Sequence, residues 1–262
     1  MSNRQIEYNT AELVAIIASR SLEDNKVAFV GAGLPLISAI LAQKTHAPHL
    51  AILFEGGVVA PDIRPGRLPP STNEARAAYR AVMLPTPTDL FSLQQRGYID
   101  YGFLGGAQID QYGNINTSVI GDYEHPKVRL PGSGGGNDII SSCNMTIITT
   151  HHEKRRFVEK VDFITSPGYI WGGDSREKAG LIHGKILKII THLCTMSFDE
   201  TTRRIRLEAL CPGATVEQVV ENTGFELLIP EKVHVLDPPT ENELKILREL
   251  DPEQRYTRPR EK

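Results

Sequence analysis

A strand, a glycine turn, a helix and a second strand follow one another near the N-terminus, and this order constrains the fold more than any other feature. Residues 27–30 and 51–54 are short apolar runs with the length of buried strands. Between them, Ile37, Ile40 and Leu41 mark a helix of about ten residues. Such a βαβ unit implies parallel pairing and a right-handed crossover. The sequence therefore predicts an α/β fold.

The rest of the chain continues the alternation of helices and strands. Asn9 or Thr10 can cap a first helix, and Glu12 completes a capping box with Asn9. Thr240 and Glu243 open the last helix in the same way. A further helix is predicted over residues 216–222. The later predicted strands cover residues 99–104, 115–120, 145–149, 161–165, 184–190 and 204–210, the last two antiparallel.

Length and composition exclude several classes of protein. The 262 residues, 40% of them hydrophobic, suffice for a sizeable core, and we expect one domain over residues 1–262 with a frayed tail at 255–262. A net charge of −3 lacks the basic excess of a nucleic-acid-binding protein. No apolar run approaches the roughly 20 residues that span a bilayer, and residues 1–8 lack the apolar core of a signal peptide. We therefore predict a cytoplasmic protein with no nucleic-acid or membrane partner.

Glu55 is the strongest candidate for a reactive side chain. It directly follows the apolar run Ala51–Phe54 and precedes Gly56 and Gly57, which let the chain turn sharply. Ligands of α/β proteins bind at the carboxyl ends of strands, where a buried carboxylate is costly unless it has a partner or a role. Two interpretations stay open from this segment alone: a poorly solvated nucleophile, and a capped or salt-bridged structural glutamate.

A long proline-rich segment, residues 58–90, follows Glu55. Within it, Glu74–Tyr79 has the composition of a short helix. A long excursion inside a compact domain is usually functional, so we predict a lid over a binding site. We call residues 58–90 the excursion; its prolines include Pro61, Pro65, Pro69, Pro70, Pro85 and Pro87.

Three glycine-rich loops follow predicted strands. The first, Gly31–Gly33, opens like a dinucleotide fingerprint, but Leu36 stands where the third glycine belongs. The loop at residues 132–137 lacks the Lys-Ser/Thr of a P-loop. Unpaired backbone N–H groups in such loops can bind an anion or a developing oxyanion, although each loop alone is also explained as a tight turn. Together with the loop at 105–110 and Glu55, they favour a binding site.

Metal, thiol and serine chemistry have little support. His151-His152-Glu153 begins like a zinc signature, but Arg156 stands where its second histidine belongs. The basic run at 154–156 is interpreted as a solvated face in preference to a phosphate site. No Gly-x-Ser-x-Gly elbow occurs. The three cysteines, odd in number and far apart, predict no disulfide framework or metal site: Cys143, Cys194 and Cys211.

Motifs along nearly the whole chain share one order and spacing. Four of them are Val30–Pro35, Phe54–Gly57, Gly105–Asn114 and Gly132–Asn137. Four others are Ser118–Tyr123, His152–Phe157, Thr165–Gly168 and Glu221–Phe225. The first set resembles the family I CoA-transferases, and the second resembles the small, or B, chain of the glutaconate type. One departure is Gly56, where that family usually has serine or asparagine.

The resemblance implies a fold, a reaction and a set of site residues. The fold is an open, mostly parallel sheet flanked by helices, with some antiparallel strands toward the C-terminus. Glu55 is the implied nucleophile, which forms an acyl-glutamyl anhydride and then a glutamyl-CoA thioester in ping-pong order. CoA is a substrate, with no other cofactor and no metal. The implied oxyanion and substrate loops contain Gly31, Gly33, Gly105, Gly106 and Gln108, and the CoA side is lined by Gly134, Gly135, Gly136 and Asn137.

The resemblance also implies a partner and leaves alternatives. A CoA-transferase A subunit is expected, in a hetero-oligomer such as A2B2 or larger. The acids are expected to be dicarboxylic and glutaconate-like. Two other functions stay open: a decarboxylase or ring-opening hydrolase subunit of the same fold, and a non-catalytic acyl-CoA-binding subunit. The carboxylate of Glu55 favours transfer over both.

Overall fold

A computed structural model describes residues 7–259 of the chain, in two compact units. Unit 1 consists of Met1–Leu90 and Asp237–Lys262, and unit 2 consists of Phe91–Leu236. The first and last parts of the sequence thus belong to the same unit. Whether the chain folds as one domain stays a prediction.

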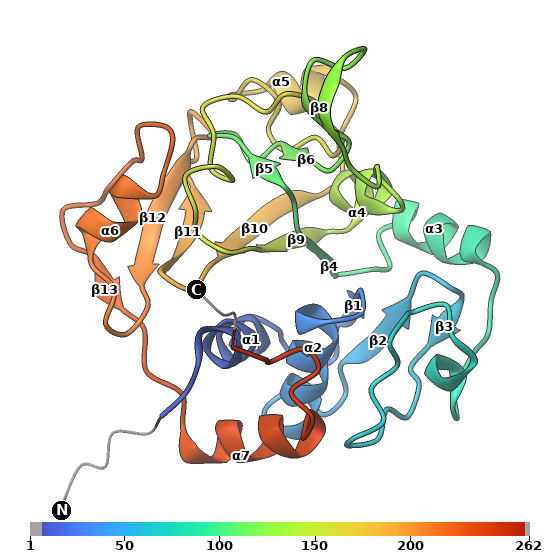
Figure 1. The fold of residues 1–262 in the computed structure, drawn as a ribbon. Helices are drawn as coiled ribbons and strands as arrows, with labels where there is room; N and C mark the ends of the chain where they lie inside the picture. Colours follow the sequence, from blue (N-terminus) through green and yellow to red (C-terminus); the bar gives the residue numbers. More distant parts are fainter. Residues whose placement is uncertain (1–6, 260–262) are drawn as a thin grey trace, which may run out of the picture. The chain divides into compact units, whose positions relative to one another are not determined.

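Unit 1 contains the predicted βαβ unit together with further helices (Figure 1). Its elements are α1 (Thr10–Arg20), β1 (Val27–Phe29), α2 (Leu34–Lys44), β2 (Ala51–Phe54), β3 (Val58–Val59), the 3-10 helix η1 (Ala75–Ala78) and α7 (Glu241–Leu250). β1 and β2 are parallel, with Phe29 opposite Leu53, and β3 runs antiparallel to β2. α7, drawn in red, returns from the far end of the sequence to contact α1 and α2 (Figure 1).

The predicted helix caps are confirmed, and they also connect the helices of unit 1. The Asn9 side chain accepts from the backbone N–H of Glu12, whose carboxylate accepts in turn from the Asn9 backbone N–H at 2.9 Å. Thr240 and Glu243 form the same box at the start of α7. Glu243 also pairs with Arg20 at 2.7 Å, so one carboxylate caps α7 and ties it to α1.

Unit 2 contains a larger sheet and two small hairpins. Its strands are β4 (Tyr101–Leu104), β5 (Gln108–Ile109), β6 (Ile115–Asn116), β7 (Val119–Gly121), β8 (Pro126–Arg129), β9 (Met145–Thr149), β10 (Lys185–Ile190), β11 (Cys194–Phe198), β12 (Ile205–Leu210) and β13 (His234–Val235). Its helices are α4 (Gly136–Ser142), α5 (Ser175–Lys178) and α6 (Val216–Glu221), and α3 (Pro87–Gln95) spans the boundary between the units. Within unit 2, the strands of the large sheet have the order β13-β12-β11-β10-β9-β4.

The strand directions confirm the predicted α/β class with antiparallel strands toward the C-terminus. β4, β9 and β10 are parallel neighbours, whereas β11 is antiparallel to both β10 and β12. The predicted strands at 184–190 and 204–210 are therefore not partners of each other. Each pairs with β11, a strand that the sequence interpretation misses because it treats Cys194 only as a packed thiol.

Two further strand predictions were wrong, and in both cases a side chain replaces the backbone partner. Residues 161–165 form no strand: the Asp162 N–H donates to the Gln108 side chain at 3.0 Å, and the Asp162 carboxylate accepts from the Gly121 N–H at 2.8 Å. The predicted strand at 115–120 is divided into β6 and β7. There the Asn116 side chain accepts from the N–H groups of Ser118 and Val119 and breaks the ladder.

The C-terminal segment is held where a frayed tail was expected. The Asp251 carboxylate accepts from the backbone N–H of Tyr256 at 2.8 Å and of Thr257 at 3.0 Å. The Tyr256 hydroxyl donates to the Pro69 carbonyl at 2.6 Å, which ties this segment to the excursion. Residues 260–262 lie outside the described part of the chain. Among residues 7–259, no helix has the length and apolar character to cross a membrane.

Candidate active site

Glu55 lies in a tight turn at the carboxyl end of β2. The Gly57 N–H donates to the Phe54 carbonyl at 3.0 Å, and the chain then reverses into β3. Phe54 is fully buried, whereas Glu55 is half-buried. Within the described residues of unit 1, the Glu55 carboxylate has no hydrogen bond and no ion pair. The turn therefore holds this carboxylate by its backbone alone, without the capping or salt bridge of a structural glutamate.

Both glycines of this turn are required by the close approach of the excursion. Gly57 has φ +89°, and a Cβ there would lie 2.1 Å from the Pro85 carbonyl oxygen. A Cβ on Gly56 would lie 2.5 Å from Asn73 Oδ1 and 2.9 Å from the Thr72 carbonyl oxygen. The volume that a serine or asparagine at position 56 would need is thus filled from the excursion. This packing accounts for the departure from the expected family pattern at Gly56.

The Gly31–Gly33 loop lies at the same sheet edge as Glu55. Because β1 and β2 are parallel and in register, their carboxyl ends are neighbours, and the Val30 N–H donates to the Leu53 carbonyl at 3.0 Å. Gly33 has φ +105° and begins α2, with no side chain capping the helix. The first N–H groups of α2 therefore carry the partial positive charge of an uncapped helix end.

In unit 2, the Gly105–Gly106 loop is fixed from several sides. Arg156 Nη1 donates to the Gly106 carbonyl at 2.9 Å, and the Ala107 N–H donates to the Asn116 carbonyl at 2.9 Å. A Cβ on Gly106 would lie 2.5 Å from Ile115 Cγ2, so this position requires glycine. Gly105 is exposed. Arg156, interpreted from sequence as part of a solvated basic face, is instead half-buried and supports the loop.

The side chain of Gln108 forms hydrogen bonds within unit 2. Its side chain donates to Asp162 at 3.0 Å and accepts from Asn116 Nδ2 at 2.7 Å and from the Asp162 N–H at 3.0 Å. Only 7% of the residue is exposed. The side-chain amide therefore supports the loop from within unit 2. A contact between Gln108 and a substrate stays a prediction, and it would be made by the backbone.

The Gly134–Asn137 loop lies beside the end of β4 in the same unit. A Cβ on Gly136 would be 3.6 Å from Leu104 Cδ2 and 3.1 Å from Ser166 Oγ, so no larger residue fits without movement there. Gly134 and Asn137 are exposed, and the Asn137 N–H donates to Ser133 Oγ at 3.0 Å. Unit 2 thus brings the Gly105 and Gly134 loops together, as unit 1 brings together Glu55 and the Gly31 loop.

His152 and the three cysteines are buried, and their surroundings indicate structural roles. His152 is buried against Phe157, and its two ring nitrogens lie 3.1 Å from the hydroxyls of Thr191 and Thr223. Burial, followed by the nearby His192 and His151, lowers the pKa of His152 to about 3. All three thiols are buried, and burial raises the pKa of each to about 12. Within residues 7–259, no three His, Cys, Asp or Glu side chains converge on a possible metal position.

Comparison with known proteins gives one consistent family. Residues 11–222 match the Coenzyme A transferase family. The chain is 42% identical over 245 residues to the B chain of 3-oxoadipate CoA-transferase from Pseudomonas knackmussii, covering 93% of this chain and 94% of that one. It is 38% identical over 257 residues to the B chain of glutaconate CoA-transferase from Acidaminococcus fermentans, covering 95% of both. The crystal structure of that glutaconate enzyme superposes with a TM-score of 0.89 at 36% identity, covering 96% and 98%.

A further relative acts in hydrolysis. The cholesterol ring-cleaving hydrolase IpdB subunit of Rhodococcus jostii is 30% identical over 224 residues, covering 84% of this chain and 83% of that one. The fold and the matches together define the class of this α/β chain. It belongs to the coenzyme A transferase family and corresponds to the B subunits of that family. The family resemblance seen in the sequence is thereby confirmed, and the B-type relatives support an A-subunit partner.

Proposed function

We propose that this chain is the B subunit of a dicarboxylate CoA-transferase in which Glu55 is the covalent nucleophile. The half-buried Glu55 carboxylate, unpaired within its unit and held in a glycine turn at a strand end, is the observation that carries the proposal. A nucleophile must be presented without a partner that would compete for its lone pairs. A non-catalytic acyl-CoA-binding subunit would have no use for such a group.

The reaction proceeds through two covalent states of Glu55. A carboxylate oxygen attacks the thioester carbonyl of the donor acyl-CoA, and the C–S bond breaks to give an acyl-glutamyl anhydride and CoA thiolate. The thiolate attacks the Glu55 carbonyl of the anhydride, releasing the donor acid and leaving a glutamyl-CoA thioester. An acceptor carboxylate then repeats these steps in reverse order, which regenerates the Glu55 carboxylate.

Each addition step places negative charge on a former carbonyl oxygen, and the glycine loops supply N–H groups for it. The uncapped start of α2 and the exposed Gly31 lie at the carboxyl edge next to Glu55. The Gly105 and Gly134 loops of unit 2 are assigned to the acyl and CoA sides of the thioester. Removing one oxyanion donor typically costs roughly 100- to 1000-fold in rate.

Water must be kept from the anhydride, because hydrolysis would end the cycle without transfer. The excursion contacts the Glu55 turn through Asn73 on one side and Pro85 on the other, which suits a covering role. The A subunit is proposed to complete the cover and to recognise the distal part of the acid. A hetero-oligomer of A and B subunits in a reducing compartment such as the cytoplasm is part of this proposal.

The substrate is proposed at the level of a dicarboxylic acid. The two CoA-transferase relatives are named for glutaconate and for 3-oxoadipate, and both of these acids carry two carboxylates. The sequence alone leads to a glutaconate-like acid, and the similarity to the 3-oxoadipate enzyme extends that expectation to longer and oxo-substituted acids.

Ring-opening hydrolysis is the second candidate function, favoured by the 30% identity to the ring-cleaving hydrolase subunit. Trapping separates it from transfer. The assembled A and B subunits are incubated with glutaconyl-CoA or 3-oxoadipyl-CoA, treated with borohydride and digested for mass spectrometry. Transfer requires reduction of Glu55 to its alcohol, dependent on acyl-CoA and absent in Glu55→Gln. Consumption of acyl-CoA by the wild type with Glu55 unmodified would instead contradict transfer and favour a decarboxylase or hydrolase of the same fold. Glu23→Gln, an exposed glutamate in the same unit, is the control and should be trapped like the wild type.

A further inference from the structure

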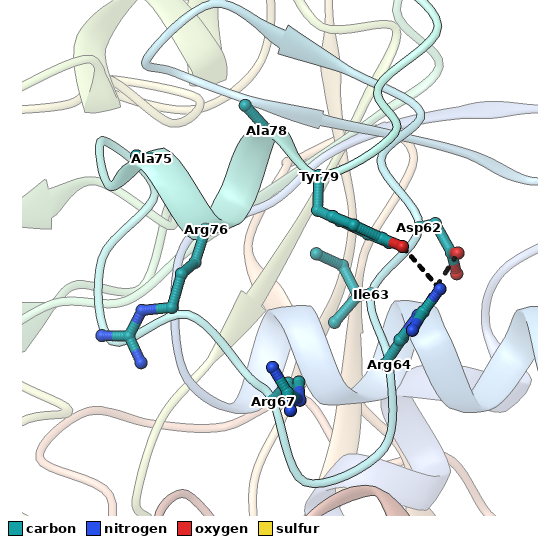
Figure 2. A pocket seen from close by; sticks show the side chains of 8 residues that line it. All are labelled: Asp62, Ile63, Arg64, Arg67, Ala75, Arg76, Ala78 and Tyr79. Carbon is teal, nitrogen blue, oxygen red and sulfur yellow. Dashed lines mark hydrogen bonds and ion pairs between the residues drawn. The ribbon is translucent and has the colours of Figure 1, made fainter.

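A cavity of about 370 Å³ opens within the excursion of unit 1 (Figure 2). One wall is the loop that contains Arg64 and Arg67, and the other is η1 with Arg76 and Tyr79 (Figure 2). Its volume lies in the range of small-ligand pockets, about 300–1,000 Å³. We call it the arginine pocket; its lining residues are Asp62, Ile63, Arg64, Arg67, Ala75, Arg76, Ala78 and Tyr79.

The arginine pocket is positively charged in a chain that is negative overall. Residues 62–80 contain four arginines and two carboxylates, a net charge of +2, whereas the whole chain has −3. Asp62 is shared between Arg64 at 3.8 Å and Arg80 at 3.6 Å. The other carboxylate, Glu74, pairs with Arg76.

Arg67 is the arginine of this set without such a partner. No described residue of unit 1 forms a hydrogen bond or ion pair with its guanidinium, and the side chain is exposed. A guanidinium presents its N–H donors in a fixed fork that matches carboxylate and phosphate oxygens. The pocket therefore offers a free anion-binding group beside two arginines that are already partly neutralised.

The two walls are fixed to each other before any ligand binds. The Asp62 N–H donates to the Tyr79 carbonyl at 3.0 Å, and Arg64 Nη2 donates to the Tyr79 hydroxyl at 2.6 Å (Figure 2). The Arg64 guanidinium also lies over the Tyr79 ring, 4.6 Å from its centroid. Because the hydroxyl oxygen only accepts in that bond, its own proton stays available to donate to an anion. Such a pre-formed site has less ordering cost on binding.

We propose that the arginine pocket binds phosphate groups, and that their source is the phosphorylated end of CoA. This proposal rests on the proposed function, since CoA carries a diphosphate and a 3′-phosphate remote from its thiol. Phosphate is favoured over a carboxylate because three arginines and the Tyr79 hydroxyl line the pocket, and Arg67 among them has no partner among the described residues of unit 1.

The pocket is also connected to the nucleophile through the chain. Residues Thr72 and Asn73, directly before η1, form the wall against which Gly56 of the Glu55 turn packs. Phosphates held by η1 and the Arg64–Arg67 loop would fix that wall. Binding energy from a non-reacting part of the substrate would then support the geometry at the reacting carboxylate.

The test compares two thioesters of one acid in the assembled enzyme: the acyl-CoA, and the acyl-pantetheine that lacks every phosphate. For Arg67→Ala we expect KM for acyl-CoA to rise about tenfold or more, the usual size for a lost hydrogen bond to a charged group. The kcat/KM for acyl-pantetheine should not change. Arg67→Lys should raise the KM for acyl-CoA by a smaller factor. Arg258→Ala replaces an exposed arginine of the same unit outside the pocket and should leave this KM unchanged.

If Arg67→Ala lowers kcat/KM equally for both thioesters, or changes it for neither, the assignment is overturned. If the wild type transfers from neither thioester, the proposed function fails, and titration calorimetry with free CoA still decides the pocket. Tenfold weaker CoA binding by Arg67→Ala would support it, and unchanged binding would overturn it. Inorganic phosphate binding as tightly as CoA would show a site for free phosphate and overturn the assignment to CoA.

Discussion

Two carboxylates, Glu55 and Asp110, follow strands in glycine-rich segments, yet their surroundings are opposite. Asp110 is 2% exposed and accepts hydrogen bonds from the Tyr112 N–H and from both the backbone and the side chain of Asn114, at 2.9 to 3.1 Å. Burial raises the pKa of Asp110, and its hydrogen bonds with Asn114 oppose that rise. Glu55 is half-buried and has no such partner in its unit.

The difference predicts a structural role for Asp110 and a reactive role for Glu55. A carboxylate with several hydrogen bonds has its lone pairs occupied, so it stabilises a loop and is a poor nucleophile. A carboxylate held only by its backbone leaves its oxygens free for substrate. Mutation of Asp110 should therefore affect folding and mutation of Glu55 should affect chemistry, and four experiments can break or sharpen that division.

The largest effect is expected for Glu55→Gln. Removing a covalent nucleophile should lower kcat by about 10⁴-fold or more. Because the carboxylate has no partner in unit 1, the free energy of unfolding should change by less than about 0.5 kcal/mol. Steady-state kinetics and urea unfolding of the same preparation measure both quantities. Strong destabilisation would mean that Glu55, like Asp110, is structural.

Asp110→Ala should give the reverse result. It leaves the Asn114 amide and the backbone N–H groups of the loop without acceptors, which should cost about 2–4 kcal/mol of stability. Activity per folded molecule should stay within a few-fold of wild type. Denaturant midpoints and active-site titration of the folded fraction test this. Asp110→Asn, which retains one acceptor oxygen, is the milder control, and a loss of chemistry in a stably folded Asp110→Ala protein would contradict a structural role.

Gly56→Ala tests whether the excursion holds the Glu55 turn. The added Cβ would meet Asn73 Oδ1 and the Thr72 carbonyl, and overpacking of this kind costs about 1–3 kcal/mol. We expect a lower kcat as well, because the turn must shift to make room. Asn73→Gly in the same chain removes the closer contact and should restore part of both losses. A double-mutant cycle measures this coupling, and strictly additive effects would show that Asn73 and Gly56 are independent.

His152 is a third titratable group, and burial favours its neutral form. Its pKa is about 3 in the folded protein and near 6.5 when unfolded, so the unfolded chain takes up a proton first as pH falls. Its contribution to stability is complete above pH 6.5 and is lost as pH drops toward 3, at about 1.4 kcal/mol per pH unit. Urea unfolding at pH 7.5, 6.5 and 5.5 should show a shallower pH dependence for His152→Gln than for wild type. Equal slopes would mean that folding does not lower the pKa of His152.

Local sequence patterns are sufficient for much of the fold. The βαβ unit, the capping boxes at Asn9 and Thr240 and the existence of strands β4 and β9 are predictable because periodicity and cap chemistry act over a few residues. The strand error at 115–120 arises from a local side chain, Asn116, and the error at 161–165 arises where a distant side chain takes the place of a backbone partner. Asp162 bonds to Gln108 across 54 residues of sequence, and no pattern near residue 162 signals that contact.

Some features of the candidate site are also visible in the sequence, and others only in the structure. Glu55 and its two glycines are identified from a strand followed by a sharp turn, a local signal. The supporting roles of Arg156 and Asn73 escape the sequence, because each is defined by a contact with a loop far away in the chain. A basic run and a proline-rich excursion are ordinary surface features until the structure shows what they touch.

The sequence by itself determined the α/β class and the family, and it singled out Glu55 as the candidate nucleophile, since short-range patterns and motif order carry that information. Only the tertiary structure decided that this carboxylate is unpaired within its unit while Asp110 is enclosed by donors, and that the excursion closes on Gly56 and forms an arginine pocket. The physical reason is that burial, hydrogen bonding and charge depend on neighbours in space, and most of these neighbours are far apart in the chain.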